Sequence, residues 1–109
     1  MLSGGQTVAV IFHLAEPVAW ADAQRSGTYA PASFEDEGFI HGSTAEQVPA
    51  TYRRYYADRT DLVLLALDDE GLDVRWEAAP SSELFPHVYS AIPTAKFQSR
   101  GTYLGDEIE

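Results

Sequence analysis

The stretch GFIHGST, residues 38–44, carries the clearest information about how this chain folds. The run Phe39, Ile40, His41 predicts a short buried strand. The hydroxyl residues Ser43 and Thr44 follow at once, and residues of this kind cap helices. The chain is therefore expected to turn from a strand into a helix here. Corners of this type present side chains and free backbone N–H groups to a ligand.

The three histidines of the chain lie in similar apolar settings. They occur in FHL (12–14), FIHG (39–42) and FPHV (85–88). Each one alone is consistent with a core histidine bonded to the backbone, because histidine is often partly buried. All three share the same setting at predicted strand ends, so we predict that they converge on one polar pocket.

Composition sets limits on the function. The length of 109 residues predicts one domain, 1–109, with frayed ends over 1–6 and 105–109. Seventeen acidic against seven basic residues give a net charge of -10, which opposes non-specific binding to nucleic acid and docking on an anionic membrane. The absence of cysteine excludes disulfides and thiolate zinc sites and fits a cytoplasmic protein. Residues 1–10 lack the pattern of a signal peptide, and the longest apolar run, 62–67, is too short to span a bilayer.

The pattern of apolar residues predicts an α+β domain with a mixed or antiparallel sheet and two helices in the N-terminal half. Pro17 predicts a helix start and Gly27 a helix end, whereas Pro31 predicts that the segment around it is extended. The predicted elements are, in order, a strand over 8–14, a helix over 16–27, an extended segment over 29–33, a strand over 39–41, a helix from about Gln47 (or from a capping box at Ser43 and Glu46), and strands over 61–67, 74–77, 87–92 and within 95–104.

Taken together, several segments resemble a bacterial family catalogued as domain of unknown function 952. They span almost the whole chain: FHL (12–14), Trp20 with Ala23, Gly27 with Tyr29, EGFIHGST (37–44) with Gln47, DLVLL (61–65), RWE (75–77) and FPHVY (85–89). The resemblance implies a compact ADP-ribosyltransferase-like fold, in which a split β-sheet clamps a nicotinamide dinucleotide. NAD or ADP-ribose is the substrate that this resemblance implies.

The resemblance also implies roles for individual residues. His13 would bond a ribose hydroxyl, and His41 or Ser43 would occupy the following strand end. Glu77, or failing that Glu83, would polarise the ribose 2′-hydroxyl and stabilise an oxocarbenium-like transition state. The catalytic candidates are therefore Glu77, His41 and His13. The ligand-binding candidates are His13, His41, Gly42, Ser43, Thr44, His87 and Tyr89.

Two other readings stay open on the sequence alone. The same cleft would serve a non-catalytic ligand-binding or interaction module. His13, His41 and His87 with Glu77 are also chemically suited to zinc or iron, although no close spacing such as H-x-H supports a metal site. The pair Arg53 and Arg54 is interpreted as a solvated helix face, and the tyrosines at 52, 55 and 56 as core.

Overall fold

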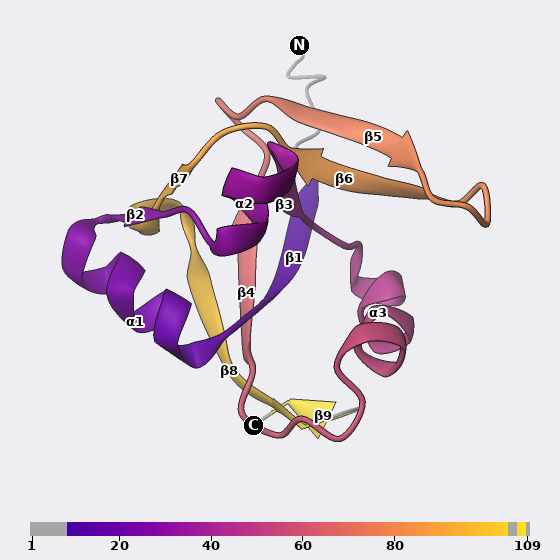
Figure 1. Ribbon diagram of the computed structural model, residues 1–109, viewed down its shortest axis with the longest axis horizontal. Helices are drawn as coiled ribbons and strands as arrows, with labels where there is room; N and C mark the ends of the chain where they lie inside the picture. Colours follow the sequence, from indigo (N-terminus) through magenta and orange to yellow (C-terminus); the bar gives the residue numbers. More distant parts are fainter. Residues whose placement is uncertain (1–8, 105–106, 109) are drawn as a thin grey trace, which may run out of the picture.

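The computed structural model describes residues 9–104 and 107–108 (Figure 1). The pairings among the described strands are all antiparallel, and the α-helices lie in the first half of the chain, so the protein is an α+β structure. The elements are β1 (Val10–Ala15), α1 (Pro17–Ser26), β2 (Thr28–Tyr29), α2 (Ala32–Glu37), β3 (Ile40–His41), the 3₁₀ helix η1 (Ala45–Gln47), α3 (Val48–Tyr55), β4 (Val63–Asp68), β5 (Val74–Ala78), β6 (Leu84–Val88), β7 (Ile92–Pro93), the 3₁₀ helix η2 (Thr94–Lys96), β8 (Gln98–Leu104) and β9 (Glu107–Ile108).

Strand β4 lies at the centre of the core. It pairs with β1 on one side and β8 on the other, in a sheet ordered β1-β4-β8-β9. Leu65 and Leu67 face one apolar cluster, which Ala23 of α1 and Tyr29 also join, whereas Leu64 faces a second cluster. The second cluster is Leu14, Val48, Tyr52, Leu62, Leu64 and Tyr103. Helices α1 and α3 cover the two opposite faces of the sheet at β4 (Figure 1). Side chains on both faces of β4 are therefore buried, which explains why its sequence is apolar at consecutive positions.

The helix boundaries test the predictions from Pro and Gly. Helix α1 begins at Pro17 and ends at Ser26, and Gly27 is its C-cap residue in a left-handed conformation with φ of 90°, so the predicted start and end signals are confirmed. The expectation of an extended segment over 29–33 is confirmed for Tyr29 in β2 and for Pro31, whose backbone is extended. It is wrong for residues 32 and 33, because Pro31 is the N-cap residue of helix α2. A proline at a helix start removes no helical hydrogen bond, since the first N–H groups have no partner within the helix. The described residues in the first half of the chain therefore contain three α-helices, not two.

The corner after β3 contains a capping box one residue later than the predicted one. Thr44 Oγ1 accepts a hydrogen bond from the backbone N–H of Gln47 (3.2 Å), and the Gln47 side-chain oxygen accepts one from the Thr44 N–H (3.0 Å). Ser43 is unavailable as the cap because its backbone still pairs with Phe12 in an isolated antiparallel bridge. The predicted helix start near Gln47 is confirmed, with η1 leading directly into α3.

The predicted strand over 87–92 is two strands that belong to different sheets. Strand β6 ends at Val88 and pairs with β3 and β5, whereas β7 pairs with β2. At the C-terminal end, Glu107–Ile108 pair with β8 as strand β9. The remaining residues predicted to be frayed, 1–6 and 105–106 and 109, lie outside the described part of the chain. Among the described residues, no helix has the length and apolar character needed to cross a membrane.

Residues 40–43 connect the β3-β6-β5 sheet to β1. His41 lies opposite His87 of β6, the Gly42 N–H donates to the Pro86 carbonyl (2.9 Å), and Ser43 pairs with Phe12. The chain passes so close at Gly42 that a Cβ there would lie 2.5 Å from Ile11 Cγ2 and 2.8 Å from the Pro86 oxygen. Glycine is therefore required at this position for steric reasons. The crossing, meaning residues 40–43 where they pass from β6 to β1, fixes His41 beside His87.

Candidate functional site

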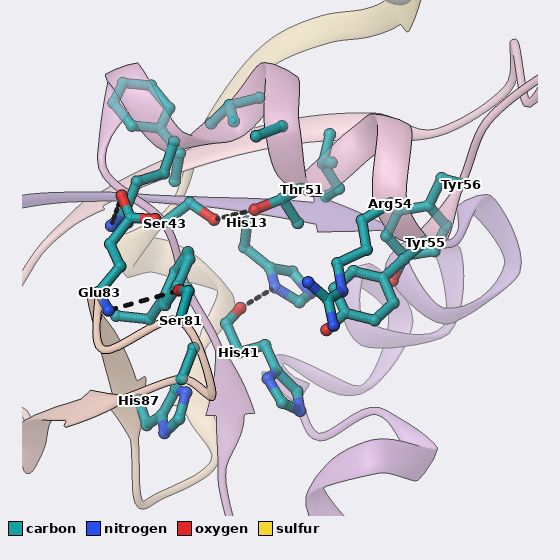
Figure 2. A pocket seen from close by; sticks show the side chains of 18 of the residues that line it. His13, His41, Ser43, Thr51, Arg54, Tyr55, Tyr56, Ser81, Glu83 and His87 are labelled. Carbon is teal, nitrogen blue, oxygen red and sulfur yellow. Dashed lines mark hydrogen bonds between the residues drawn. The ribbon is translucent and has the colours of Figure 1, made fainter.

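A cavity of about 680 Å³ opens between helix α3 and the β5–β6 hairpin (Figure 2). Its other walls come from β1, α2 and the segment after β3. All three histidines line it, so the structure brings together the residues that were predicted to converge. Figure 2 shows Ser81 and Glu83 on one side of the cavity, and Arg54 and Tyr55 on the opposite side.

His13 has hydrogen bonds at both ring nitrogens. Its Nδ1 lies 2.6 Å from the carbonyl oxygen of His41, and its Nε2 lies 2.7 Å from the hydroxyl oxygen of Tyr29. A carbonyl oxygen only accepts, so Nδ1 carries the hydrogen and donates it. The hydroxyl of Tyr29 then donates to Nε2. This arrangement needs a neutral imidazole and a protonated tyrosine.

The electrostatics agree with that protonation state. Burial lowers the pKa of His13 to about 4, and burial is also the main reason why the pKa of Tyr29 lies above its ordinary value. His13 is therefore neutral at pH 7 with both nitrogens engaged by the protein. It forms a fixed part of the wall and offers no free ring nitrogen to a ribose hydroxyl.

His41 points a more exposed ring toward helix α2. Its Nε2 lies 2.7 Å from Oε1 of Glu37, and the His41 side chain is 53% exposed. The spacing of four residues across Gly38 creates this pair, because Gly38 ends α2 in a left-handed conformation and β3 follows directly. In the part of the chain that the structure describes, no protein group bonds Nδ1 of His41.

His87 is held more tightly than His41. Its Nδ1 lies 2.7 Å from Oε1 of Glu77, and its side chain is only 15% exposed. The ring of Phe39 stacks on the imidazole, with centroids 4.2 Å apart and planes inclined by 18°. The rings of His41 and His87 meet edge to face at a centroid distance of 5.2 Å. The two imidazoles, each with its own carboxylate, are therefore neighbours at the cavity.

Glu77 lies behind His87 and is not part of the cavity lining. Its Oε1 accepts hydrogen bonds from the hydroxyl of Tyr89 (2.7 Å) and from His87. Two hydrogen bonds lower the pKa of Glu77: the larger contribution comes from Tyr89 and the smaller one from His87. The Glu77 carboxylate in turn raises the pKa of Tyr89. The guanidinium of Arg75 lies 4.2 Å from the centroid of the Tyr89 ring. Glu77 is thus an ionised group that is fixed by its neighbours.

Other polar groups of the lining come from the segment after β3, from η1, from α3 and from the hairpin. Ser43 is buried, and its Oγ lies 3.2 Å from Oγ1 of Thr51. The side-chain amide of Gln47 donates to Glu83 (3.0 Å) and to the Leu84 carbonyl (2.8 Å), which ties the corner to the hairpin. These contacts hold the two walls of the cavity together.

The predicted site residues divide into two groups. His13, His41, Gly42, Ser43, His87 and the second-choice Glu83 line the cavity. Thr44 serves in the capping box, while Glu77 and Tyr89 support His87 from behind.

Sequence reasoning missed several lining residues, namely Glu37, Thr51, Arg54 and Tyr55. Arg54 lines the cavity, and Tyr55 is 68% exposed, so the interpretation of Tyr55 as core is wrong. The spacing of Glu37 and His41 was visible in the motif over 37–44. No local pattern marked the other three residues. The described residues contain no group of three or more His, Asp or Glu side chains arranged to hold a metal ion, so the metal reading gains no support.

Comparison with known proteins establishes the family. The model of a protein family described as a protein of unknown function, DUF952, matches residues 14–100, so the chain belongs to this family. The crystal structure of protein CC0527 from Caulobacter crescentus, a structural genomics target, is similar with a TM-score of 0.79 and 26% sequence identity, over 93% of this chain and 94% of that chain. The solution NMR structure of CC0527 has a TM-score of 0.75 and 28% identity, over 91% and 90% of the two chains. No curated protein matches the chain.

Proposed function

We propose that the cavity binds a nicotinamide nucleotide or a related ribosyl phosphate. Its volume of about 680 Å³ is in the range of small-molecule sites, which run from roughly 300 to 1,000 Å³. The class of ligand comes from the resemblance of the sequence to a compact ADP-ribosyltransferase-like fold. The lining adds the group types that such a ligand requires: hydroxyls, imidazoles and aromatic rings.

The observation that carries the proposal is the placement of charge in the cavity, whose lining, among the described residues, holds the cationic Arg54 and the acidic Glu37, Glu46 and Glu83. The cationic Arg54 lies on one side and the acidic Glu83 on the other (Figure 2). Nicotinamide mononucleotide has a phosphate at one end and a positively charged pyridinium ring at the other. The phosphate would bind near Arg54, and the pyridinium ring would lie toward Glu83. Ser43 and Thr51 would offer hydroxyls to the ribose between them.

The test is a titration with nicotinamide mononucleotide followed by amide chemical shifts. Binding in the proposed orientation should perturb residues around Gly42, Thr51 and Glu83. Arg54→Gln should weaken binding of the nucleotide but not of free nicotinamide, because only the nucleotide carries the phosphate. Arg25→Gln is the matched control, because Arg25 lies in the last turn of α1 and outside the cavity lining. Shifts confined to surfaces away from the cavity, or none at millimolar ligand, would refute the proposal.

A further inference from the structure

His87 is the imidazole best placed to react in the cavity. Glu77 fixes it at Nδ1 and Phe39 stacks on its face, and it lines the cavity while remaining mostly buried. No group in the described part of the chain bonds its Nε2. An oriented ring with one nitrogen held and the other unengaged is the arrangement that a general base requires.

The partner at Nδ1 determines where the lone pair lies. An ionised carboxylate only accepts hydrogen bonds, so Nδ1 of His87 carries the hydrogen that Glu77 accepts. In the neutral ring, the lone pair is then on Nε2. The hydroxyl of Tyr89 also donates to Glu77, which keeps the carboxylate ionised and fixed in position.

The other two histidines are less suited to this role. Both nitrogens of His13 are engaged by His41 and Tyr29. The ring of His41 is more than half exposed, and its carboxylate partner Glu37 is itself 49% exposed at the end of a short helix. Only His87 combines enclosure, a fixed carboxylate and an unengaged nitrogen.

We propose that His87 is the general base that activates water to cleave the N-ribosyl bond of nicotinamide mononucleotide, and that Glu77 is the positioning residue for His87. The substrate rests on the proposed function. One proton of the water passes to Nε2 of His87 as the water oxygen bonds to C1′ of the ribose. The C1′–N bond breaks, and its electron pair goes to the pyridinium nitrogen. The products are ribose 5-phosphate and neutral nicotinamide, and His87 then releases its proton to solvent.

This assignment gives Glu77 a different task from direct stabilisation of a ribosyl cation. A carboxylate that lies behind the imidazole and outside the lining acts through the ring that it orients. Its loss should matter only while His87 is present. That dependence distinguishes the two roles experimentally.

The first experiment measures nicotinamide release from nicotinamide mononucleotide. His87→Ala should lower kcat by about 100-fold or more with little change in KM, because the base acts in the transition state. Added imidazole should restore part of the rate to His87→Ala but leave the wild type unchanged. His87→Gln, which keeps more of the side-chain volume, is the second variant in case the alanine variant folds poorly. Glu70→Gln, in the turn after β4 and outside the cavity lining, is the control.

The second experiment is a double-mutant cycle between Glu77 and His87. Glu77→Gln alone should lower kcat at least about tenfold, since the ring loses its orientation. In the His87→Ala background the same change should have no further effect. A further loss of about 100-fold there would show that Glu77 stabilises the substrate directly, and would overturn the positioning role.

The outcomes separate this inference from the proposed function. Binding of the nucleotide in the cavity without nicotinamide release would overturn the assignment of His87 and leave the binding proposal intact. Full turnover by His87→Ala and His87→Gln would also overturn it. Failure of the nucleotide to bind would remove both proposals together. Three results together support the inference. Nicotinamide release depends on His87, added imidazole restores part of the rate to His87→Ala, and Glu77→Gln has no further effect in the His87→Ala background.

Discussion

Replacing His13 by glutamine should remove a large part of the pH dependence of stability. The pKa of His13 is about 4 in the fold, against 6.5 for an ordinary histidine. Above pH 6.5 the residue is neutral in both the folded and the unfolded chain and contributes no pH dependence. Between pH 6.5 and 4 the unfolded chain binds a proton that the folded protein does not. The free energy of unfolding therefore falls as the pH falls through this window.

The magnitude follows from the size of the pKa difference. Each pH unit within the window costs about 1.4 kcal/mol, so the full loss between pH 6.5 and pH 4 is about 3 kcal/mol. The physical cause is burial of the ring, together with hydrogen bonds from Tyr29 and to His41 that fit only the neutral form. Glutamine is the suitable replacement because its amide offers one donor and one acceptor without titrating.

The assay is denaturant unfolding of the wild type and His13→Gln between pH 7.5 and 4.5. The wild type should lose about 2.5 kcal/mol more than the variant over this range. Carboxyls with lowered pKa values, such as Glu77 and Asp68, lose their contributions mainly below pH 4.5, and they are common to both proteins. Their effects therefore cancel in the difference. A constant offset between the two proteins at every pH would refute the reasoning, because it would mean that His13 titrates equally in both states.

Two further predictions concern the contacts that build the cavity wall. Gly42→Ala should lower the free energy of unfolding by about 1–3 kcal/mol, because the new Cβ would lie 2.5 Å from Ile11 Cγ2, and an unchanged thermal midpoint would contradict the close packing. Tyr29→Phe should cost about 1–3 kcal/mol in denaturant unfolding, because Nε2 of His13 loses its donor. The matched variant at the exposed Tyr55, Tyr55→Phe, should be nearly neutral, and equal costs for the two variants would argue against a role for the buried hydroxyl.

The predictable parts of the fold were those with a strong local cause. The run at 61–67 is apolar on both faces because both faces of β4 are covered, and helix α1 has a proline at its start and a glycine at its end. Helix α2 was not predicted because its six residues after Pro31 are too few to show the periodicity of apolar residues that is typical of a helix. The break between β6 and β7 was not predicted either. The two strands pair with different partners, β6 with β3 and β7 with β2. Strand pairing is a tertiary property, so it does not show in the periodicity of apolar residues along the sequence.

The candidate site shows the same division between local and tertiary information. The three histidines were identifiable because each lies in an apolar run, and the cavity contains all of them. Their individual tasks depend on partners from elsewhere in the chain. Tyr29 engages His13, and Glu77 engages His87 from a neighbouring strand. Arg54 looked like a solvated residue of α3, because a helix face gives no sign of what lies across a cavity from it.

The crossing at residues 40–43 explains why these histidines differ in what they can do. One backbone segment pairs with β6 at His41 and with β1 at Ser43, so the main chain there has little freedom. The carbonyl oxygen of His41 consequently accepts the hydrogen bond from Nδ1 of His13, and the ring of His41 lies against the ring of His87. Both ring nitrogens of His13 are therefore engaged, whereas no group in the described part of the chain bonds Nε2 of His87. Chemistry in this cavity should therefore depend on residue 87 more than on residue 13.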